Sequence, residues 1–315
     1  MSPSKFVVCV LLIFVKSELV PESNMTQLDS MPLQSLEKDP KPSDFHFLIT
    51  GGYRPKTNKL VKYVVSLRLG NSKKFFGDNH YCAGAIFSSR AILTAAHCLY
   101  SNRRKLTPKK LTVIAGTPKR LVKSDSTQIV QAHKLLPHPK YKKGKSQKYD
   151  IGIVLMKEDL SLGGSVASIP LYNKAPVAGV QCSIIGWGTV IQYGPLPDEV
   201  INGDVKILPN TFCRKLLGWS STGMLCANDQ SNTEVDSCQG DSGGPLICDN
   251  KVTGIVSFGT GCGEPDSAGI YTDVYHFRDW INENSCPRAL CPMRTLLILV
   301  LQLQLTFLAI IRGVF

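Results

Sequence analysis

The chain has 315 residues, of which 43% are hydrophobic and 19% are charged, and its 36 basic and 24 acidic side chains give a net charge of +12. This composition excludes a disordered or collagen-like chain, because enough apolar side chains are present to bury a large core. Eleven cysteines are too many for an ordinary cytosolic protein, and no CxxC pair indicates a zinc module. The basic excess favours acidic partners but does not bear on the fold.

The N-terminal segment, residues 1–17, has the pattern of a secretory signal peptide. Lys5 precedes an apolar run over 6–15, and a small residue follows near a cut site. The run is too short to span ~30 Å of hydrocarbon comfortably, so we expect cleavage rather than anchoring. The following segment, 18–48, is polar and rich in proline, which indicates a flexible propeptide. It contains a glycosylation sequon at Asn24.

The C-terminal segment, residues 286–315, is a second hydrophobic stretch. Residues 295–311 are apolar except for threonines and two glutamines, with Arg294 before them and Arg312 after them. This length is at the short end for a transmembrane helix, and the pattern also fits a lipid-anchor signal that would be removed. An amphipathic or core helix is the plain alternative, although no clear polar face is visible. We therefore expect a protein of the secretory pathway that is extracellular or attached to the cell surface.

The middle of the chain, 49–285, predicts many short strands. The strand-like runs are rich in β-branched and aromatic residues and are separated by turn-forming residues. They cover residues 62–69, 111–115, 128–132, 151–156, 182–185, 205–208, 246–248 and 252–258. Only 274–284 has a helical pattern. Such spacing indicates an all-β sandwich or barrel.

Three motifs carry residues that are suited to nucleophilic catalysis. TAAHC contains His97, DIGIVL begins with Asp150, and GDSGGP surrounds Ser242 with glycines. Glycines let the backbone approach a ligand closely, and a serine among them can present its hydroxyl beside N–H groups that bind an oxyanion. Each residue alone is more often structural. Together, in the order His, Asp, Ser, they match one known order of a nucleophilic triad.

On these motifs, residues 49–285, which are 237 of the 315, resemble a trypsin-like serine endopeptidase of the chymotrypsin superfamily. The resemblance implies an all-β fold of two six-stranded antiparallel β-barrels with a C-terminal helix. The active site would lie in the cleft between the barrels. His97 and Asp150 would come from the first barrel, and Ser242 would come from the second.

The resemblance also implies a role for each site residue. Ser242 would attack the scissile carbonyl, His97 would take its proton and return it to the leaving amine, and Asp150 would fix the histidine tautomer. The backbone N–H groups of Gly240 and Ser242 would form the oxyanion hole. This chemistry needs no cofactor and no metal. Thr117 stands where calcium-binding relatives carry a carboxylate, so we expect no calcium site.

Specificity follows from the same resemblance. Asp236, six residues before Ser242, would sit at the bottom of the primary pocket, where a buried carboxylate demands a cationic partner. Cleavage after Arg or Lys is therefore implied. Phe258 stands where the family usually has Trp, so it keeps an aromatic wall and bears on the preference just upstream of the cut. The implied substrate-binding residues are Asp236, Ser237, Ser257, Phe258, Gly259 and Gly269.

Eight of the eleven cysteines fall where the family forms four disulfides. Spacing alone could not choose the pairing, since eight cysteines allow 105 connectivities. The resemblance implies the pairs Cys82–Cys98, Cys182–Cys248, Cys213–Cys226 and Cys238–Cys262. For Cys286 and Cys291 in the C-terminal segment, mutual pairing, lipidation and removal all stay open.

Activation departs from the family pattern. Family zymogens are cut before an Ile-Val-Gly-Gly-like start, and the new α-amino group pairs with the Asp that precedes the nucleophile. Here Ile49 opens the start Ile-Thr-Gly-Gly, and the partner would be Asp241. The preceding residue is Leu48 rather than Arg or Lys. Trypsin-like self-activation is therefore not implied, and a protease that prefers Leu or Phe is needed.

Two basic stretches, 103–123 and 140–148, remain. Solvated loops are the plain interpretation, and an exosite for acidic proteins or sulfated glycans is the alternative. Nucleic acid is not an expected partner. The leading hypothesis is a serine endopeptidase that hydrolyses protein or peptide substrates after Arg or Lys by acyl-enzyme chemistry. The alternative is a catalytically silent homologue that acts as a membrane-tethered binding or regulatory protein.

Overall fold

The computed structural model describes residues 51–144, 146–218 and 221–285. The predicted signal peptide, propeptide, glycosylation site at Asn24 and hydrophobic tail lie outside these residues, as do Leu48, Ile49, Cys286 and Cys291. Within the described ranges, no helix combines the length and the apolar character that crossing a membrane requires.

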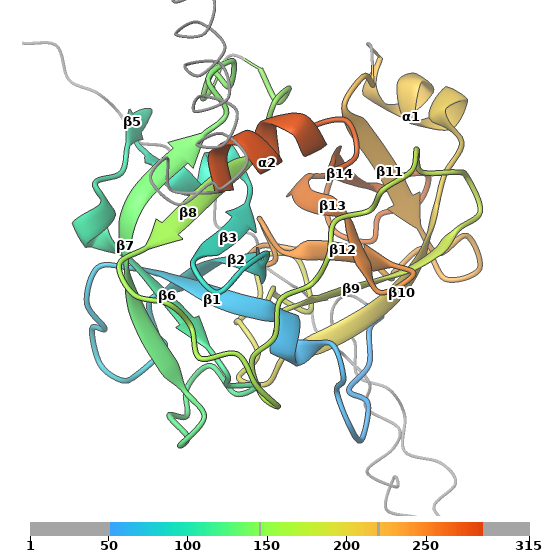
Figure 1. Cartoon of the computed structure of the whole chain (residues 1–315). Helices are drawn as coiled ribbons and strands as arrows, with labels where there is room; N and C mark the ends of the chain where they lie inside the picture. Colours follow the sequence, from blue (N-terminus) through green and yellow to red (C-terminus); the bar gives the residue numbers. More distant parts are fainter. Residues whose placement is uncertain (1–50, 145, 219–220, 286–315) are drawn as a thin grey trace, which may run out of the picture. The chain divides into compact units, whose positions relative to one another are not determined.

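Twelve strands form two closed antiparallel barrels (Figure 1). The first barrel has the order β1-β2-β3-β8-β7-β6 and the second has the order β10-β11-β14-β13-β12-β9. The first consists of β1 (Val64–Leu69), β2 (His80–Ile86), β3 (Ala91–Thr94), β6 (Leu111–Ala115), β7 (Gln128–Pro137) and β8 (Gly152–Met156). The second consists of β9 (Gln181–Gly186), β10 (Ile201–Ile207), β11 (Met224–Asn228), β12 (Pro245–Cys248), β13 (Lys251–Phe258) and β14 (Gly269–Asp273). The predicted fold class is confirmed.

The smaller elements are a hairpin and short helices. The hairpin joins β4 (Tyr100–Ser101) to β5 (Arg104–Lys105). The 3-10 helices are η1 (Val61–Tyr63), η2 (Ala96–Leu99) and η3 (Pro108–Lys110), and the α-helices are α1 (Asn210–Leu217) and α2 (Arg278–Ser285). The helix predicted over 274–284 is α2.

The sequence-based assignment missed four of the twelve barrel strands and one α-helix. Strands β2, β3, β11 and β14 are short or rich in Ala, Gly and Cys, which weakens the β-branched and aromatic signal. The prediction that only the C-terminal segment is helical was wrong, because α1 is also a helix. Two signals mark α1: Pro209 stands just before it, and Gly218 ends it in the left-handed conformation at φ 69°.

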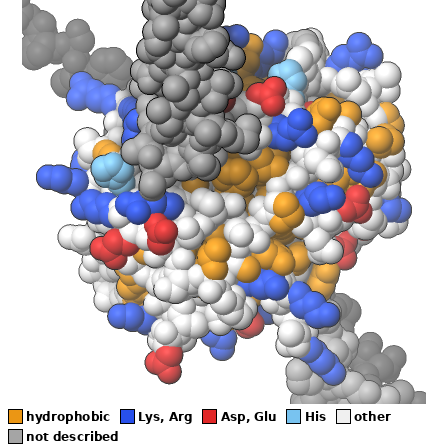
Figure 2. All heavy atoms as spheres, viewed as in Figure 1, with side chains coloured by type: hydrophobic (Ala, Val, Ile, Leu, Met, Phe, Trp, Pro, Cys, Tyr) orange, Lys and Arg blue, Asp and Glu red, His pale blue; other side chains and the backbone are white. Residues whose placement is uncertain are grey.

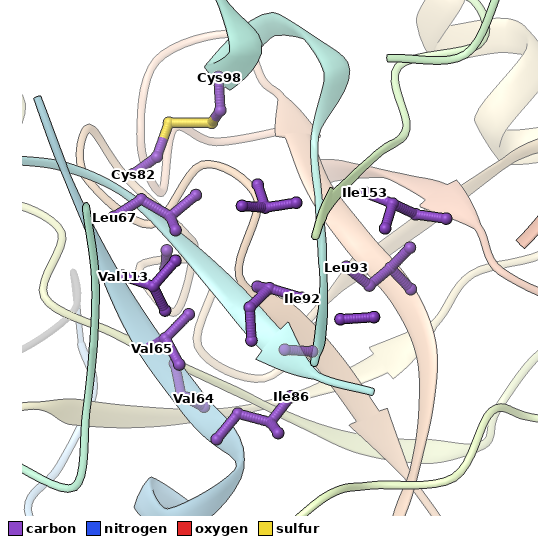
Figure 3. Close-up of a cluster of buried hydrophobic side chains, with 14 of the residues drawn as sticks. Val64, Val65, Leu67, Cys82, Ile86, Ile92, Leu93, Cys98, Val113 and Ile153 are labelled. Atoms are coloured by element: carbon purple, nitrogen blue, oxygen red, sulfur yellow. A yellow bond between two sulfur atoms is a disulfide. The ribbon is translucent and has the colours of Figure 1, made fainter. Parts of the chain in front are cut away.

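Branched aliphatic side chains fill the first barrel. Figure 3 shows Val65, Leu67, Ile92 and Val113 close together, with the Cys82–Cys98 disulfide at one edge of the cluster. Each fully buried Leu, Ile or Val contributes about 1.5–3 kcal/mol relative to an exposed position. This packing stabilises the barrel next to two segments of the chain. One segment follows β3, and the other precedes β8.

The second barrel has its own core, and the chain then returns to the first barrel. Tyr172, Leu246 and Tyr271 are fully buried in the second cluster. Helix α2 follows the second barrel in sequence but contacts β8, and its Ile281 belongs to the core of the first barrel. This returning helix fastens the two barrels to each other.

The described residues contain four disulfides, and these are the four pairs that the resemblance implied. They join Cys82 to Cys98, Cys182 to Cys248, Cys213 to Cys226, and Cys238 to Cys262. Disulfides persist in oxidising compartments, so this set is typical of a secreted or extracellular protein.

Candidate active site

A histidine and an aspartate meet where two paired strands of the first barrel end. His97 lies on η2 just after β3, and Asp150 lies just before β8; Thr94 of β3 pairs with Gly152 of β8. The His97 ring Nδ1 is 2.7 Å from Asp150 Oδ2, and the His97 backbone N–H donates to Asp150 Oδ1 at 2.7 Å. Both carboxylate oxygens therefore fix the histidine, which leaves the ring Nε2 for other partners.

The second barrel supplies further hydrogen bonds to the same aspartate. The Ser257 hydroxyl donates to Asp150 Oδ2 at 2.6 Å, and the Thr272 hydroxyl donates to the Asp150 backbone carbonyl at 2.7 Å. Asp150 is only 4% exposed. A buried carboxylate is tolerated when its oxygens are hydrogen-bonded and a cationic partner is at hand. These bonds therefore give the buried carboxylate and its backbone carbonyl hydrogen-bond partners, and they also tie the barrels together at the site.

Ser242 reaches the site through contacts of its backbone. Its carbonyl accepts a hydrogen bond from the Ala83 N–H at 2.8 Å, and Cys98 Sγ lies 3.5 Å from the same oxygen. Gly243 makes this approach possible: at φ 80° it would place a Cβ 2.1 Å from Thr94 Oγ1. Among the described residues no hydrogen bond joins Ser242 to the His97 ring, and such bonds often tighten only with substrate bound.

Two backbone N–H groups beside Ser242 are available to a ligand. In the described part of the chain, neither the Gly240 N–H nor the Ser242 N–H has a hydrogen-bond acceptor. The Gly240 carbonyl faces away, toward His80 Nε2 at 3.1 Å, while His80 Nδ1 is 2.8 Å from Ser66 Oγ. Burial lowers the pKa of His80 to about 3, so a neutral ring holds the Gly240 turn in place.

Asp236 is a buried carboxylate without a cationic partner among the described residues. The side chain is 3% exposed, and it accepts hydrogen bonds from the backbone N–H groups of Ser237 at 2.8 Å and Gly263 at 3.1 Å, with a further contribution from the Ser237 side chain. Burial raises the pKa of Asp236 to about 6, against the lowering effect of these bonds. A methyl group at Gly269 would come within 2.7 Å of Asp236 Oδ1, whereas one at Gly259 would meet nothing nearer than 3.6 Å. The two glycines thus leave room beside the carboxylate.

Asp241 is a second buried carboxylate without a cationic partner among the described residues. It is 2% exposed and accepts hydrogen bonds from the N–H groups of Gly188 at 2.7 Å and Cys238 at 3.0 Å. Burial raises the pKa of Asp241 to about 6. The predicted partner, Ile49, lies outside the described residues. Gly51, two residues further on, is already packed against Val235, since a Cβ there would lie 3.1 Å from its side chain.

A cavity of about 510 Å³ opens beside His97. Ser257 and Phe258 of β13 form one side, and residues of the loop 141–147 form the other, including Tyr141 and Lys143. Burial raises the pKa of Tyr141. Phe258 lines this cavity, and its role as an aromatic wall of the substrate site stays a prediction. Neither Tyr141 nor Lys143 belongs to a catalytic motif, and only the folding of their loop toward β13 brings them here.

Other contributors also escaped the sequence analysis. Thr272, which bonds the Asp150 backbone, and the Ser66–His80 pair behind Gly240 come from strands without a recognisable motif. One further cluster has metal-like spacing, formed by Cys82, His97 and Cys98. The two cysteines are joined in a disulfide, so they offer no thiolate to a metal.

Two antiparallel barrels, with a hydrogen-bonded His–Asp pair in one and a glycine-flanked serine in the other, define a serine protease of the chymotrypsin fold. The trypsin family model matches residues 49–281. The chain belongs to the trypsin family.

Known relatives agree with this assignment. The chain is 37% identical over 237 residues to trypsin eta of Drosophila erecta, covering 74% of this chain and 88% of the relative. It is 33% identical over 244 residues to trypsin-3 of Homo sapiens, covering 77% of this chain and 74% of the relative. The structure of neuropsin, a serine protease expressed in mouse brain, superposes with a TM-score of 0.62 at 31% identity, covering 72% of this chain and 95% of neuropsin. The chain is thus a trypsin-like serine protease, a hydrolase of protein or peptide substrates.

Proposed function

We propose that the protein is an active endopeptidase that hydrolyses peptide bonds after Arg or Lys, with His97, Asp150 and Ser242 as its triad. The observation that carries the proposal is the combination, in one site, of the Asp150–His97 pair and the buried carboxylate of Asp236. The first supplies a general base with a fixed tautomer, and the second selects a cationic side chain. The catalytically silent alternative has no supporting observation.

In the proposed reaction, His97 Nε2 takes the proton of the Ser242 hydroxyl as Oγ attacks the scissile carbonyl. Asp150 stabilises the imidazolium that forms, since both of its oxygens face the histidine. The carbonyl oxygen becomes an oxyanion that the N–H groups of Gly240 and Ser242 bind, and each such donor is worth about 3 kcal/mol in the transition state. His97 then protonates the leaving amine, and water hydrolyses the acyl-enzyme by the same steps in reverse order.

Specificity in this proposal comes from the charge of Asp236. A guanidinium or ammonium group that enters beside Gly259 and Gly269 meets a carboxylate that has hydrogen-bond donors but no cation among its described partners. A neutral side chain would leave this buried charge unpaired, which is costly. Ser237, Ser257 and Phe258 complete the proposed substrate-binding set.

We propose that cleavage between Leu48 and Ile49 activates the protein. Asp241 needs a cation for its buried carboxylate, and the new α-amino group of Ile49 would supply one. Gly51, two residues after Ile49 in the chain, packs against Val235 of the second barrel, which supports a chain end bound on the same barrel as Asp241. Because Leu48 precedes the bond, a protease that prefers Leu or Phe would perform the cut.

The test is hydrolysis of fluorogenic peptides that end in Arg or Lys before the reporter group. The protein is the purified full chain, assayed before and after cleavage at the bond between 48 and 49. We expect activity after cleavage only, and a fall in kcat of about 10⁴-fold or more in Ser242→Ala. Ser161→Ala, on an exposed residue, is the matched control. A cleaved and correctly folded chain that hydrolyses no peptide would overturn the proposal.

Cell-surface attachment is a separate proposal. We propose that residues 1–17 are removed as a signal peptide, that 18–48 form the propeptide with a glycan at Asn24, and that 286–315 attach the protein to a membrane. N-terminal sequencing and glycosidase treatment of the secreted chain test the first two points. Release from cells by a phosphatidylinositol-specific phospholipase would indicate a lipid anchor, and retention would indicate a spanning helix.

A further inference from the structure

Two cationic segments far apart in the sequence meet at the cavity beside His97. One is the β4–β5 hairpin with the residues after it, 100–110, and the other is the loop 138–149. The rings of Tyr100 and Tyr141 have centroids 5.7 Å apart, and a Cβ on Gly144 would lie 3.5 Å from Arg103 Nε. The two segments therefore form one continuous surface, which we call the cationic rim.

The cationic rim carries many positive charges. Segment 100–110 and the described residues of 138–149 contain no Asp or Glu. The ion pairs of Arg54, Arg90 and His97 lie outside the rim, and Arg103, Lys142 and Lys143 take part in none of them. Its basic residues with described positions include Arg103, Arg104, Lys105, Lys140, Lys142 and Lys143. Figure 2 shows Lys and Arg side chains at the edge of the molecule where Figure 1 labels β5.

The cavity connects this rim to the reacting groups. It has a volume of about 510 Å³ and is lined by His97 and Phe258 on one side and by Lys143 on the other. Phe258 is followed directly by Gly259, which belongs with Asp236 to the proposed substrate-binding set. A peptide whose Arg or Lys side chain pairs with Asp236 therefore passes its preceding residues over Phe258 and toward Lys143.

We propose that the cationic rim selects substrates with Asp or Glu two to four residues before the scissile bond. This inference rests on the proposed function and adds a second specificity element to it. A carboxylate in the cavity would meet Lys143, which is half-buried, and would feel the exposed charges of Arg103 and Lys142 nearby. The carboxylate of Asp150 does not cancel this attraction, because it is buried and bonded to His97 and Ser257.

The expected size of the effect follows from exposed ion pairs. Each such pair contributes up to about 1 kcal/mol, a factor of about five. Two carboxylates upstream of Arg should therefore raise kcat/KM about tenfold over the matched amides at low salt. The gain should shrink at 1 M salt, where the screening length falls from about 10 Å to about 3 Å.

The experiment compares peptides that share Arg at the cut and carry either two Asp or two Asn residues within the three positions before it. The enzyme is the full chain cleaved between 48 and 49, and the readout is the ratio of kcat/KM for Asp over Asn. We expect a ratio near ten in the parent protein, a ratio about threefold lower in Lys143→Gln, and a ratio below one in Lys143→Glu. Lys157→Gln, at the opposite end of β8 from Asp150, should leave both peptides unchanged.

The outcomes separate this inference from the function on which it rests. Hydrolysis of every Arg peptide with an Asp/Asn ratio near one would overturn the acidic preference while leaving the protease intact. Failure to hydrolyse any of them would overturn the proposed function itself. An unchanged ratio in Lys143→Glu would likewise overturn the inference. So would inhibition by a heparin fragment without any gain for acidic peptides, which would assign the rim to sulfated glycans.

Discussion

The two barrels differ in the partners that they give to their buried carboxylates. In the first barrel, Asp150 has a histidine at both oxygens and a hydroxyl from the other barrel as a third partner. In the second, Asp236 and Asp241 accept hydrogen bonds from backbone N–H groups, and burial raises the pKa of each to about 6. The first barrel therefore holds a completed hydrogen-bonded pair. In the second, the described residues supply no cationic partner to either carboxylate, and the proposed function assigns these partners to a substrate side chain and to the α-amino group of the cleaved chain.

The disulfides follow the same division. The first barrel has one, Cys82–Cys98, which closes a separation of 16 residues directly beside His97. The other three lie in the second barrel, and Cys238–Cys262 joins the two loops around Asp236. Loop closure limits the conformations of the unfolded chain and of the loops themselves. The barrel with unpaired carboxylates is thus the one whose loops are most strongly cross-linked.

The largest expected effect on kcat/KM comes from removing the buried carboxylate of Asp236. Asp236→Asn should lower kcat/KM for Arg peptides by about 10²- to 10³-fold, because pairing a buried charge is worth about 3–5 kcal/mol when one partner is lost. Steady-state kinetics on Arg, Lys and Leu peptides measure it. Asp204→Asn on the same barrel, where the carboxylate is exposed, is the matched control. Retained Arg preference in Asp236→Asn would show that the primary pocket lies elsewhere.

A smaller effect, on kcat, should come from removing the hydrogen bond between Ser257 and Asp150 that joins the two barrels. Ser257→Ala removes the hydroxyl that donates to Asp150 Oδ2, and hydrogen bonds to charged groups contribute about 1.5–3 kcal/mol. We expect kcat to fall about tenfold or somewhat more while KM changes little. Ser183→Ala removes a similar bond, to the exposed Asp204, and should leave the kinetics unchanged. Equal losses in both variants would mean that the bridge to Asp150 has no special role.

The pH dependence of cation binding tests the raised pKa of Asp236. With a pKa of about 6, this carboxylate is charged at pH 7 and mostly protonated at pH 5. An amidinium inhibitor should therefore bind about tenfold more weakly at pH 5 than at pH 7, as measured by calorimetry with the Ser242→Ala chain. The folded-state pKa of Asp236 lies above the usual 3.8, so the folded protein binds this proton more tightly than the unfolded chain does. The unliganded protein should therefore lose stability as the pH rises from 3.8 to about 6. Constant affinity between pH 7 and pH 5 would contradict the burial-driven shift.

The sequence by itself determined the class of this protein. The motifs around His97, Asp150 and Ser242 are local, so they are legible without coordinates, and the resemblance that they carry implied the barrels and the disulfide pairs. Strand propensity alone was a weaker guide to the positions of the individual strands. It missed β2, whose Ala and Gly residues carry no β-branched signal, and β3, which is only four residues long.

Only the tertiary structure decided what surrounds these residues. Thr272 and the Ser66–His80 pair reach the site across more than one strand, and no spacing rule predicts such partners. The same holds for the cationic rim, where segments 100–110 and 138–149 each look like an ordinary solvated loop in the sequence. Barrel closure places both at the cavity beside His97. Charges add through space and not along the chain, so their combined field exists only once the fold has formed.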